Sequence, residues 1–490
     1  MMAGDRYTQG KDRLVEPLVV DLDGTLLRTD MLHESTLRAA RDCPAALLRI
    51  PAWLARGKAH LKAQLAQRVA LDVSCLPYHS EFLAWLRDQH ASGRELVLCT
   101  ASDQRYAQAV ADHLGIFSGI MASDGATNLS GARKAQALVE RYGEGGFDYA
   151  GNHPFDLPVW RHARRAVVVN APATLAAKAA ALAPVERVFP RAAPNAATGV
   201  RMLRVHQWLK NLLLFVPLLG AHAFADYGRW ADTLLGFVAF SLCASAVYIA
   251  NDLLDLESDR LHHRKRRRPF ASGDLPILWG IYAAPVLLGA SALLAWRAGP
   301  AFMATLAVYF IITAAYSLGL KRIILLDCIV LALLYTLRVI AGTATAGVAM
   351  SFWLLAFSVF LFLSLAFVKR YAELHAQLES GRDKAHGRGY LTSDAGLVQT
   401  MGITAGHGAA LVLALYLHSD EVLHLYHTPA IIWGAVPALL FWVSWMWLQA
   451  HRGHMHDDPV VFALKDRASL AAGAVFMAVL VLGTVEWPWP

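Results

Sequence analysis

The chain has 490 residues, of which 56% are hydrophobic and 17% are charged, and its formal net charge is +7. Because its mean hydropathy is +0.37, it is too apolar for an ordinary soluble protein of this length, and a membrane protein is expected. Its five cysteines are scattered along the chain without metal-ligand spacing, which argues against a disulfide framework and a zinc site.

The apolar residues are unevenly distributed. Residues 1 to about 200 mix charged and apolar side chains as a globular domain does, whereas long apolar runs follow from Trp208 onward. The first 20 residues are charged and lack an apolar segment, so no secretory signal is expected and the N-terminal domain should be cytoplasmic. The predicted organisation is a soluble domain over 1–186, a linker over 187–203 and a membrane domain over 204–490.

A buried strand is predicted at Leu18–Val20, and it runs directly into Asp21-Leu22-Asp23-Gly24-Thr25. Two carboxylates at i and i+2 just after a strand, followed by a glycine turn, project into one site. Three further pieces follow in order: a strand that ends in Thr100, a helix that opens near Lys134, and the segment 149–156, which follows another strand.

Together these pieces resemble the haloacid dehalogenase-like phosphatases, whose first motif is DxDGT. The resemblance implies a Rossmann-like, doubly wound α/β domain with its site at the carboxyl ends of the strands, and a small helical cap over it from residues 31–78. Asp21 is then the nucleophile that forms an aspartyl phosphate, and Asp23 is the acid and base. The implied ligands are Thr100 and Lys134 for phosphate, and Asp21, Asp23, Asn152 and Asp156 for Mg²⁺.

Asn152 departs from the family pattern, because most relatives carry aspartate there. Asparagine offers a carbonyl oxygen to Mg²⁺ but brings no charge, so weaker metal binding is expected. Two interpretations stay open: a regulatory domain without catalysis, and an active phosphatase. The joint presence of Asp21, Asp23, Thr100 and Lys134 favours the phosphatase.

The membrane half contains nine apolar runs that approach the roughly 20 residues needed to cross a bilayer. Their centres lie near residues 217, 242, 286, 309, 334, 361, 407, 440 and 477. Basic residues gather in alternate loops: Arg201, Arg204 and Lys210; 260–268; Lys321 and Arg322; Lys369, Arg370, Arg382, Lys384 and Arg388; Arg452, Lys465 and Arg467. By the positive-inside rule these loops are cytoplasmic, which predicts a multi-pass protein of the inner membrane, surrounded by lipid, with its C-terminus outside.

Carboxylates end the second apolar run, in Asn251-Asp252-Leu253-Leu254-Asp255-Leu256-Glu257-Ser258-Asp259. Asp252, Asp255 and Asp259 recur at three- and four-residue intervals, so on a continuous helix they share one face. A solvated helix end would interleave lysines with the acids, whereas here the cations come later, in 260–268. Carboxylates on one face suit Mg²⁺ that is shared with substrate phosphates. The basic run either closes over those phosphates or sets the topology.

Two ionisable residues, Asp327 and Arg338, interrupt a later apolar run. Such residues are costly in apolar surroundings, so a functional role is the first hypothesis and a structural ion pair between helices is the alternative. Their spacing of eleven residues places them on one helix face about three turns apart. Each is therefore expected to meet a different partner.

The acidic run resembles the first motif, NDxxDxxxD, of the UbiA superfamily of intramembrane prenyltransferases, and nine spans fit that family. A closer resemblance, over residues 201–490, is to the decaprenyl-phosphate phosphoribosyltransferases, which attach phosphoribose to a polyprenyl phosphate. The basic loop keeps most of their pattern but has His263 where proline is usual. The matching segments are Gln207-Trp208-Leu209-Lys210-Asn211, Tyr316-Ser317-Leu318-Gly319-Leu320-Lys321, Arg338-Val339-Ile340-Ala341-Gly342, Lys369-Arg370-Tyr371-Ala372-Glu373-Leu374 and Ala463-Leu464-Lys465-Asp466-Arg467.

This resemblance implies Mg²⁺-dependent transfer of 5-phosphoribose from phosphoribosyl pyrophosphate to a polyprenyl phosphate, with Asp252 and Asp255 central to catalysis. The attached phosphatase would then remove the 5-phosphate and give polyprenyl-phosphoryl ribose, a precursor of cell-envelope arabinan. The implied Mg²⁺ ligands are Asn251, Asp252, Asp255 and Asp259. The implied substrate-binding residues are Lys210, Lys265, Arg266, Arg268, Tyr316, Lys321, Arg322, Arg338, Lys369 and Arg370.

Two other functions stay open. A UbiA-type aromatic prenyltransferase with a regulatory N-terminal domain would share the first acidic motif, but that chemistry commonly shows a second DxxxD-like cluster where this chain has Lys369-Arg370-Tyr371-Ala372-Glu373 and later Asp383. A lipid-phosphate binding or transport protein would bind the lipid and release no pyrophosphate. No nucleic-acid partner is expected, and a homo-oligomer is left open.

One late segment invites a transition-metal interpretation. It contains three histidines and two aspartates: His451, His454, His456, Asp457 and Asp458. A cytoplasmic loop at the membrane surface explains this composition without a metal. We therefore expect a surface loop here.

Overall fold

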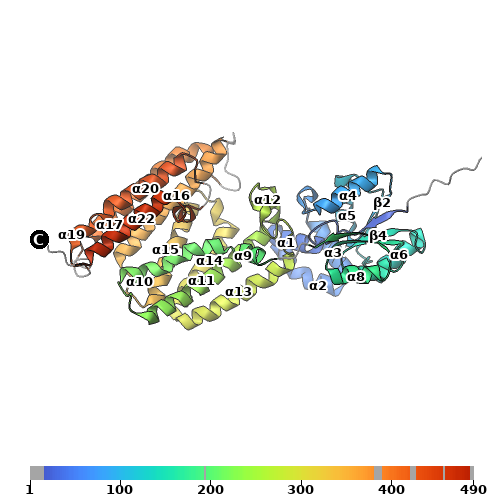
Figure 1. Ribbon diagram of the computed structural model, residues 1–490, viewed down its shortest axis with the longest axis horizontal. Coiled ribbons are helices and arrows are strands. Elements are labelled where there is room, and N and C mark those ends of the chain that lie inside the picture. Colours follow the sequence, from blue (N-terminus) through green and yellow to red (C-terminus); the bar gives the residue numbers. More distant parts are fainter. Residues whose placement is uncertain (1–15, 192–194, 380–388, 420–425, 456–457, 486–490) are drawn as a thin grey trace, which may run out of the picture. The chain divides into compact units, whose positions relative to one another are not determined.

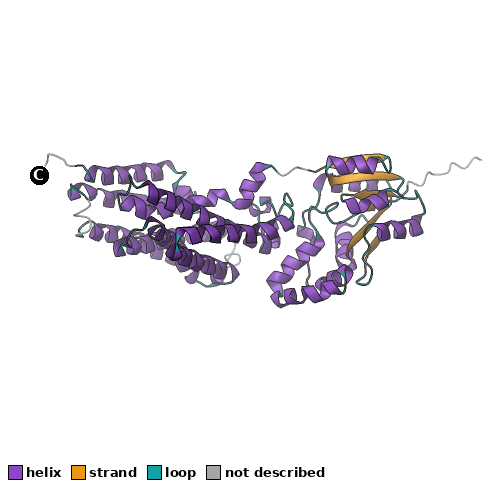
Figure 2. Cartoon of the chain, turned by 90° about the horizontal axis from the view of Figure 1, so that it is seen from below, coloured by secondary structure: helices purple, strands orange, loops and turns teal. Residues whose placement is uncertain are grey.

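The computed structural model describes residues 16–191, 195–379, 389–419, 426–455 and 458–485. It divides into two compact units (Figure 1). Unit 1 comprises Met1–Met202 and Ile249–Ala283, and unit 2 comprises Leu203–Tyr248 and Ala284–Pro490. The strands all belong to the N-terminal part of the chain, and the rest is helical (Figure 2).

A six-stranded parallel sheet forms the centre of unit 1, in the order β3-β2-β1-β4-β5-β6. Alternate residues of β1 enter different cores: Leu18 and Val20 pack on one face of the sheet and Val19 on the other. A sheet buried on both faces has apolar residues at successive positions, which is why these strands read as continuous apolar runs. The strands are β1 Leu18–Val20, β2 Leu96–Asp103, β3 Gly119–Ser123, β4 Asp148–Gly151, β5 Arg165–Ala171 and β6 Val185–Pro190.

Helices cover both faces of this sheet, which confirms the predicted doubly wound α/β domain. Helices α4 and α5 lie on one face, and α6 and α8 lie on the other (Figure 1). The strand order reverses at β1, whose neighbours are β2 and β4, and ligands of such sheets bind at the carboxyl ends of the strands at this point. The helices are α4 Ser80–Ala91, α5 Gln104–Leu114, α6 Ala132–Tyr142 and α8 Ala173–Ala180.

The predicted helical cap is present between β1 and β2 and has a small core of its own around Trp53, Leu61 and Leu65. Strand β6 pairs with β5, so the sheet continues to Pro190, into the segment expected to be linker. The domain boundaries otherwise stay a prediction. The elements of the cap and of the following connection are α1 Met31–Asp42, η1 Pro44–Arg49, α2 Ile50–Ala55, α3 Lys58–Arg68 and α9 Ala196–Leu203.

Seven helices in the described residues are long and apolar enough to cross a membrane. They coincide with seven of the nine predicted runs, and the chain is a multi-pass membrane protein. Two of them are weakly covered by protein: only 17% of the apolar window of α13 and 22% of that of α14 is buried, as expected of lipid-facing helices. The spanning elements are α11 Tyr227–Leu254, α13 Ile277–Ala298, α14 Pro300–Leu318, α15 Leu326–Ala346, α16 Phe352–Glu379, α17 Ala395–Tyr416 and α20 Ala435–His451.

The predicted count of nine spans is not confirmed. The run near residue 477 forms α22, Arg467–Gly483, of 17 residues. The run near 217 is split into a 3₁₀ helix of 11 residues, η4 Val205–Phe215, and the short α10, Val216–Gly220, because Pro217 starts a new helix. At about 2.0 Å per residue for η4 and 1.5 Å for α10, this segment is roughly 30 Å long, close to the thickness of a bilayer core.

The orientation of the chain across the membrane also stays a prediction. Arg382, Lys384 and Arg388, which helped to assign it, lie outside the described residues, as do Asp383 and the C-terminal Pro490. The other basic segments are described, but composition alone assigns them to a side of the membrane.

Helices α16 and α17 approach closely because two glycines on α17 leave room for their neighbours. A Cβ atom on Gly406 would lie 2.5 Å from Val443 Cγ1 and 2.8 Å from Ser364 Oγ. One turn earlier, the carbonyl oxygen of Gly402 accepts a hydrogen bond of 2.7 Å from Ser364 Oγ. Small residues four apart allow such packing in membranes, where burial of apolar surface does not drive helices together.

We predict that Gly406→Ala lowers the free energy of unfolding by about 1 to 2 kcal/mol, because the added methyl group overpacks this contact. The matched control is Gly396→Ala on the same helix, where nothing lies within 4 Å of the new Cβ. It should be neutral or stabilise by up to about 1 kcal/mol through helix propensity. Thermal unfolding in detergent measures both, and equal shifts would contradict the packing argument.

Candidate active sites

The carboxylates predicted for the N-terminal domain lie together at the point where the strand order reverses. Asp21 directly follows β1 and is 7% exposed. Its Oδ1 accepts a hydrogen bond of 2.6 Å from Lys134 Nζ, and its Oδ2 accepts one of 3.1 Å from Thr25 Oγ1. Lys134 is 3% exposed, so the lysine and the carboxylate form a buried ion pair in the place predicted for nucleophile and phosphate ligand.

Asp23, the predicted acid and base, is held by strand β2 and by the first turn of the cap. Its Oδ2 accepts hydrogen bonds from Ser102 Oγ at 2.6 Å and from Thr100 Oγ1 at 3.4 Å, and its Oδ1 accepts one from the Met31 backbone N–H at 2.8 Å. The sequence predicted Thr100 but not Ser102, two residues further along the same strand. The alternation of β-strand side chains, which places both on one face, was the available signal.

A second carboxylate, Asp156, is linked to the same lysine through a buried tyrosine that the sequence did not indicate. Lys134 Nζ donates to Tyr149 Oη at 3.0 Å, and Tyr149 Oη donates to Asp156 Oδ1 at 2.8 Å. Asp156 Oδ2 accepts the backbone N–H groups of Asn152 and His153, both at 2.9 Å. This network fixes Asp156 and presents the segment after β4 to the site.

Asn152 packs against the turn of the first motif. Gly24 has a φ of +76°, which favours glycine, and a Cβ atom there would collide with the side-chain amide of Asn152. The amide therefore lies beside the turn that follows Asp21 and Asp23. Its oxygen is a suitable neutral ligand for Mg²⁺.

Burial sets the protonation of these groups. It raises the pKa of Asp21, against the opposing effect of Lys134. It raises the pKa of Asp23 to about 7, with the neighbouring charges of Asp30 and Asp21 adding to the shift. Burial alone would lower the pKa of Lys134, but the carboxylate of Asp21 outweighs it, so the pKa of Lys134 is raised and the amine stays charged. Asp23 can therefore exchange a proton near neutral pH.

The acidic motif of the membrane half lies in unit 1, at a break between two helices. Helix α11 ends at Leu254, and α12, Leu256–Leu261, begins after Asp255. The expectation of one continuous helix face is therefore wrong. Asp252 and Asp259 still converge, because Arg268 Nη1 lies 3.1 Å from Asp252 Oδ1 and 2.5 Å from Asp259 Oδ2.

Asp255 sits at the break, with its Oδ1 3.8 Å from Arg41 Nη1 of the cap helix α1. Asn251, in the last turn of α11, is half-buried. Of the basic loop, Arg268 contacts the carboxylates, whereas Lys265 and Arg266 are exposed and their role in phosphate binding stays a prediction. Burial raises the pKa of Asp259, and Arg268 opposes that shift.

Two carboxylates that converge on one cationic nitrogen are a suitable donor set for Mg²⁺, with the guanidinium standing where a cation would bind. In the arrangement described here, the guanidinium of Arg268 fills this position. Accordingly, within the described ranges no three His, Cys, Asp or Glu side chains are grouped as a metal site.

A cationic cluster around a buried aspartate lies in unit 2. Lys210 of η4 and Lys369 of α16 both approach Asp458 Oδ2, at 2.7 and 3.5 Å. Tyr335 Oη donates to Asp458 Oδ1 at 2.7 Å. The surface-loop interpretation does not hold for Asp458, whose side chain is 8% exposed; His456 and Asp457 lie outside the described residues. The two lysines lower the pKa of Asp458 although burial alone would raise it.

Arg338 completes the cluster without a carboxylate. It is 4% exposed, and its Nε donates to Asn211 Oδ1 at 2.9 Å and its Nη2 to Tyr309 Oη at 3.1 Å. Its guanidinium also lies 5.5 Å from the ring centroid of Tyr335. In the part of the chain that the structure describes, no carboxylate lies within ion-pair distance of Arg338. Lys210 and Lys369 thus share one aspartate, and Arg338 adds a further cation beside them, a surplus of positive charge that favours an anionic ligand.

The remaining predicted substrate-binding residues do not belong to this cluster. Arg370 Nη2 lies 2.5 Å from Asp327 Oδ2, and both residues are fully buried, which agrees with the structural ion pair between helices. Asp327 and Arg338 therefore have different partners, as their spacing predicted. Tyr316 lies near the end of α14, and Lys321 and Arg322 form the following 3₁₀ turn. Phosphate binding by these four residues, Arg370 included, stays a prediction.

The family of the chain follows from comparison with known proteins. The UbiA prenyltransferase family matches residues 213–465, and the haloacid dehalogenase-like hydrolase family matches residues 18–161. The chain belongs to the UbiA prenyltransferase family. It carries a haloacid dehalogenase-like (HAD-like) domain at its N-terminus.

Three relatives indicate how far the similarity extends. The chain is 39% identical over 469 residues to the "Uncharacterized protein y4nM" of Sinorhizobium fredii, covering 95% of this chain and 90% of that one. It is 36% identical over 281 residues to the "Nodulation protein NoeC" of Azorhizobium caulinodans, covering 56% and 91%. It is 31% identical over 293 residues to the decaprenyl-phosphate phosphoribosyltransferase of Mycolicibacterium smegmatis, covering 58% and 92%.

The raised pKa of Asp23 gives a testable pH dependence of stability. Between its unfolded value near 4 and its folded value of about 7, the folded protein keeps a proton that the unfolded chain has lost, so stability falls as pH rises. Asp23→Asn removes the titrating carboxyl group, and with it this fall in stability. In EDTA, the stability of the variant relative to wild type should rise by about 2.5 kcal/mol between pH 5 and pH 8. A constant difference in thermal unfolding across this range would contradict the raised pKa.

The shared carboxylate of the cationic cluster gives a second prediction. Asp458→Asn should lower the free energy of unfolding by about 3 kcal/mol, because the buried Lys210 and the half-buried Lys369 lose their counter-charge. Added inorganic phosphate should raise the melting temperature of this variant more than that of wild type, since the anion supplies the missing charge. Asp226→Asn is the matched control, because Asp226 pairs with Arg229 at an exposed position. Equal phosphate responses in all three proteins would contradict an anion site.

Proposed function

We propose that the chain transfers 5-phosphoribose from phosphoribosyl pyrophosphate to a polyprenyl phosphate, and that its N-terminal domain then removes the 5-phosphate. The observation that carries the transfer step is the pair of Lys210 and Lys369 at Asp458. Arg338 lies beside Tyr335, which donates a hydrogen bond to the same aspartate. Such a cluster suits a phosphate on the acceptor or the donor. Similarity to the phosphoribosyltransferase of Mycolicibacterium smegmatis over 92% of that protein supports the choice of substrates.

The same segment argues against an aromatic prenyltransferase. Where that chemistry commonly shows a second acidic cluster, Lys369 contributes a cation to the cluster and Arg370 pairs with Asp327. A prenyl diphosphate donor bound through Mg²⁺ would need carboxylates there. The charge of this segment therefore favours a phosphate ligand bound directly by side chains.

In the proposed transfer, a phosphate oxygen of the lipid attacks the anomeric carbon of the ribose. The bond from that carbon to pyrophosphate breaks, and its electron pair leaves with the pyrophosphate. The phosphate is already ionised, so no strong base is needed, and the lysines and Arg338 orient it. Asp252, Asp255 and Asp259 would hold Mg²⁺, which when bound neutralises charge on the leaving group. Arg268 would then be available to the pyrophosphate.

In the proposed second step, Asp21 attacks the 5-phosphate and forms an aspartyl phosphate. Asp23, with its pKa raised to about 7, gives its proton to the departing ribose oxygen and then takes one from the water that hydrolyses the aspartyl phosphate. Lys134 keeps Asp21 ionised and offsets the charge of the incoming phosphate. Both reactions are proposed for the cytoplasmic side of the inner membrane.

The test is an incubation of the purified chain with phosphoribosyl pyrophosphate, a polyprenyl phosphate and Mg²⁺, followed by mass spectrometry of the lipid. Wild type should give polyprenyl-phosphoryl ribose. Asp21→Asn should accumulate the 5-phosphorylated lipid, because the nucleophile is absent. Asp252→Asn should lower pyrophosphate release by at least about 100-fold, because a metal ligand is lost.

Each contrary result would contradict a different part of the proposed function. Identical lipid from wild type and Asp21→Asn would exclude the phosphatase step. Undiminished pyrophosphate release by Asp252→Asn would exclude the acidic motif as the donor site. Binding of polyprenyl phosphate by wild type without any pyrophosphate release would favour a lipid-phosphate binding or transport protein.

A further inference from the structure

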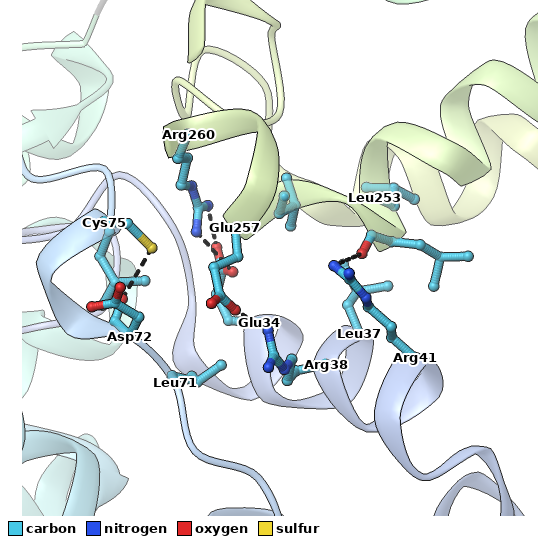
Figure 3. Close-up of a pocket in the computed structure, with 13 residues that line it drawn as sticks. Glu34, Leu37, Arg38, Arg41, Leu71, Asp72, Cys75, Leu253, Glu257 and Arg260 are labelled. Carbon is cyan, nitrogen blue, oxygen red and sulfur yellow. Dashed lines mark hydrogen bonds and ion pairs between the residues drawn. The ribbon is translucent and has the colours of Figure 1, made fainter. Parts of the chain in front are cut away.

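One face of the cap helix α1 carries three charged residues at helical spacing. Glu34, Arg38 and Arg41 are separated by four and three residues and therefore lie on the same side of the helix. Both α1 and the acidic motif with its basic loop belong to unit 1. Figure 3 shows Glu34 and Arg38 directed toward α12, the short helix that contains Glu257, Asp259 and Arg260, and Arg41 directed toward the end of α11.

Each charge on this face meets an opposite charge in or next to α12. Arg260 binds Glu34 with two hydrogen bonds, of 2.6 and 3.1 Å. Arg38 is hydrogen-bonded to Glu257. Arg41 Nη1 lies 3.8 Å from Asp255 Oδ1 and donates to the carbonyl oxygen of Leu254 at 3.4 Å. The three pairs follow the two helices in opposite directions, so they specify one register.

The pair Glu34–Arg260 is the strongest of the three. Its side chains are 5% and 6% exposed, and a two-pronged, buried carboxylate–guanidinium contact is specific in geometry. The pair at Arg41 is about one-third exposed on both sides, so solvent weakens it. The space left beside this contact is a cavity of about 30 Å³. That is room for water and not for a substrate, so the surface is a packed contact.

Helix α12 cannot set its own orientation. It has six residues and follows a break at Asp255, and isolated helices of this length are not stable in water. Its direction decides where Asp259 lies relative to Asp252 of α11, and hence whether both carboxylates reach the same cation. Two backbone hydrogen bonds, from Asp255 N–H to Asn251 and from Asp259 N–H to Asp255, link α12 to α11, and tertiary contacts supply the remaining constraint.

The other end of α1 reaches the phosphatase site. The Met31 backbone N–H donates to Asp23 at 2.8 Å, and Thr29 Oγ1 donates to Glu34 at 2.7 Å. One 12-residue helix therefore begins at the predicted acid of one reaction and ends at the acidic motif of the other.

We infer that Glu34 and Arg38 of the HAD-like domain are positioning residues for the acidic motif of the transferase. They hold α12 so that Asp252 and Asp259 converge on a cation, although neither residue touches that cation. The inference rests on the proposed function for the identity of the substrate, but the convergence itself can be tested with a metal ion alone.

The experiment uses the full chain with Asp21→Asn, which weakens the N-terminal metal site, and follows Mn²⁺ binding by electron paramagnetic resonance. The site of interest is the one that Asp252→Asn abolishes. Glu34→Arg and Arg260→Glu should each weaken it by about 10-fold, because like charges then face each other across the contact. The double swap should return affinity to within about 3-fold of the parent. Arg49→Glu, an exposed charge reversal in the same cap, should change nothing.

The second readout is transferase activity, measured in chains that keep Asp21. Glu34→Arg should raise KM for phosphoribosyl pyrophosphate about 10-fold with a smaller change in kcat, and the double swap should reverse this rise. Hydrolysis of p-nitrophenyl phosphate should persist in the single variants, which shows that the domain is folded.

The outcomes separate the two proposals. Wild type that releases no pyrophosphate would contradict the proposed function, while Mn²⁺ affinity would still decide the positioning role. Mn²⁺ affinity unchanged by both single reversals, or lowered without rescue in the double swap, would overturn the positioning role even if the transfer reaction is confirmed.

Discussion

A carboxylate that is removed from water must be compensated by a nearby cation, and this constraint shapes both units of the molecule. Asp21 has Lys134, Asp327 has Arg370, Asp458 has two lysines, and Glu34 has Arg260. Breaking such a pair costs several kcal/mol because the remaining charge stays buried. The pairs therefore act as fixed points, and the elements that carry them have little freedom to shift independently.

The same constraint identifies the places where compensation is incomplete. Arg338 is surrounded by aromatic rings and neutral acceptors, and two lysines share one carboxylate nearby. A membrane protein has no water at hand to screen such a surplus. A fully compensated pair such as Asp327–Arg370 supports the fold, whereas a surplus of charge indicates a ligand. Charge balance therefore distinguishes structural from functional charged residues that look alike in the sequence.

Local patterns predicted the N-terminal domain well because its site is built from segments that each follow a strand. The motif after β1 and the segment after β4 reach one place through sheet topology alone, so the proximity of Asp21, Asp23 and Asp156 could be predicted from the sequence. Tyr149 could not be assigned, because a tyrosine on a buried strand has no distinctive signature, whereas strand alternation from Thr100 was a signal for Ser102. Seven apolar helices were equally predictable from composition, and the two shorter segments show the limit of that signal.

Contacts between residues that are far apart in the sequence were not predicted. Lys210 and Asp458 are separated by 248 positions, and nothing near Asp458 distinguishes it from a surface aspartate. The break at Asp255 was also hidden, since the residues around it favour a continuous helix. The partners of α1 were hidden for a related reason: its charges look like an ordinary solvated face until the second helix is placed against it.

The shared carboxylate of Asp458 has a consequence for turnover in the proposed reaction. A lipid phosphate that approaches Lys210 and Lys369 must compete with an aspartate already bound to them, so its binding is an exchange of counter-ions. In that reaction the attacking phosphate would change from a monoester to a diester, so this group would carry less negative charge, although the product keeps the ribose 5-phosphate until the second step. Asp458 would then regain the lysines more easily. A residue that weakens substrate binding would thus promote departure of the product.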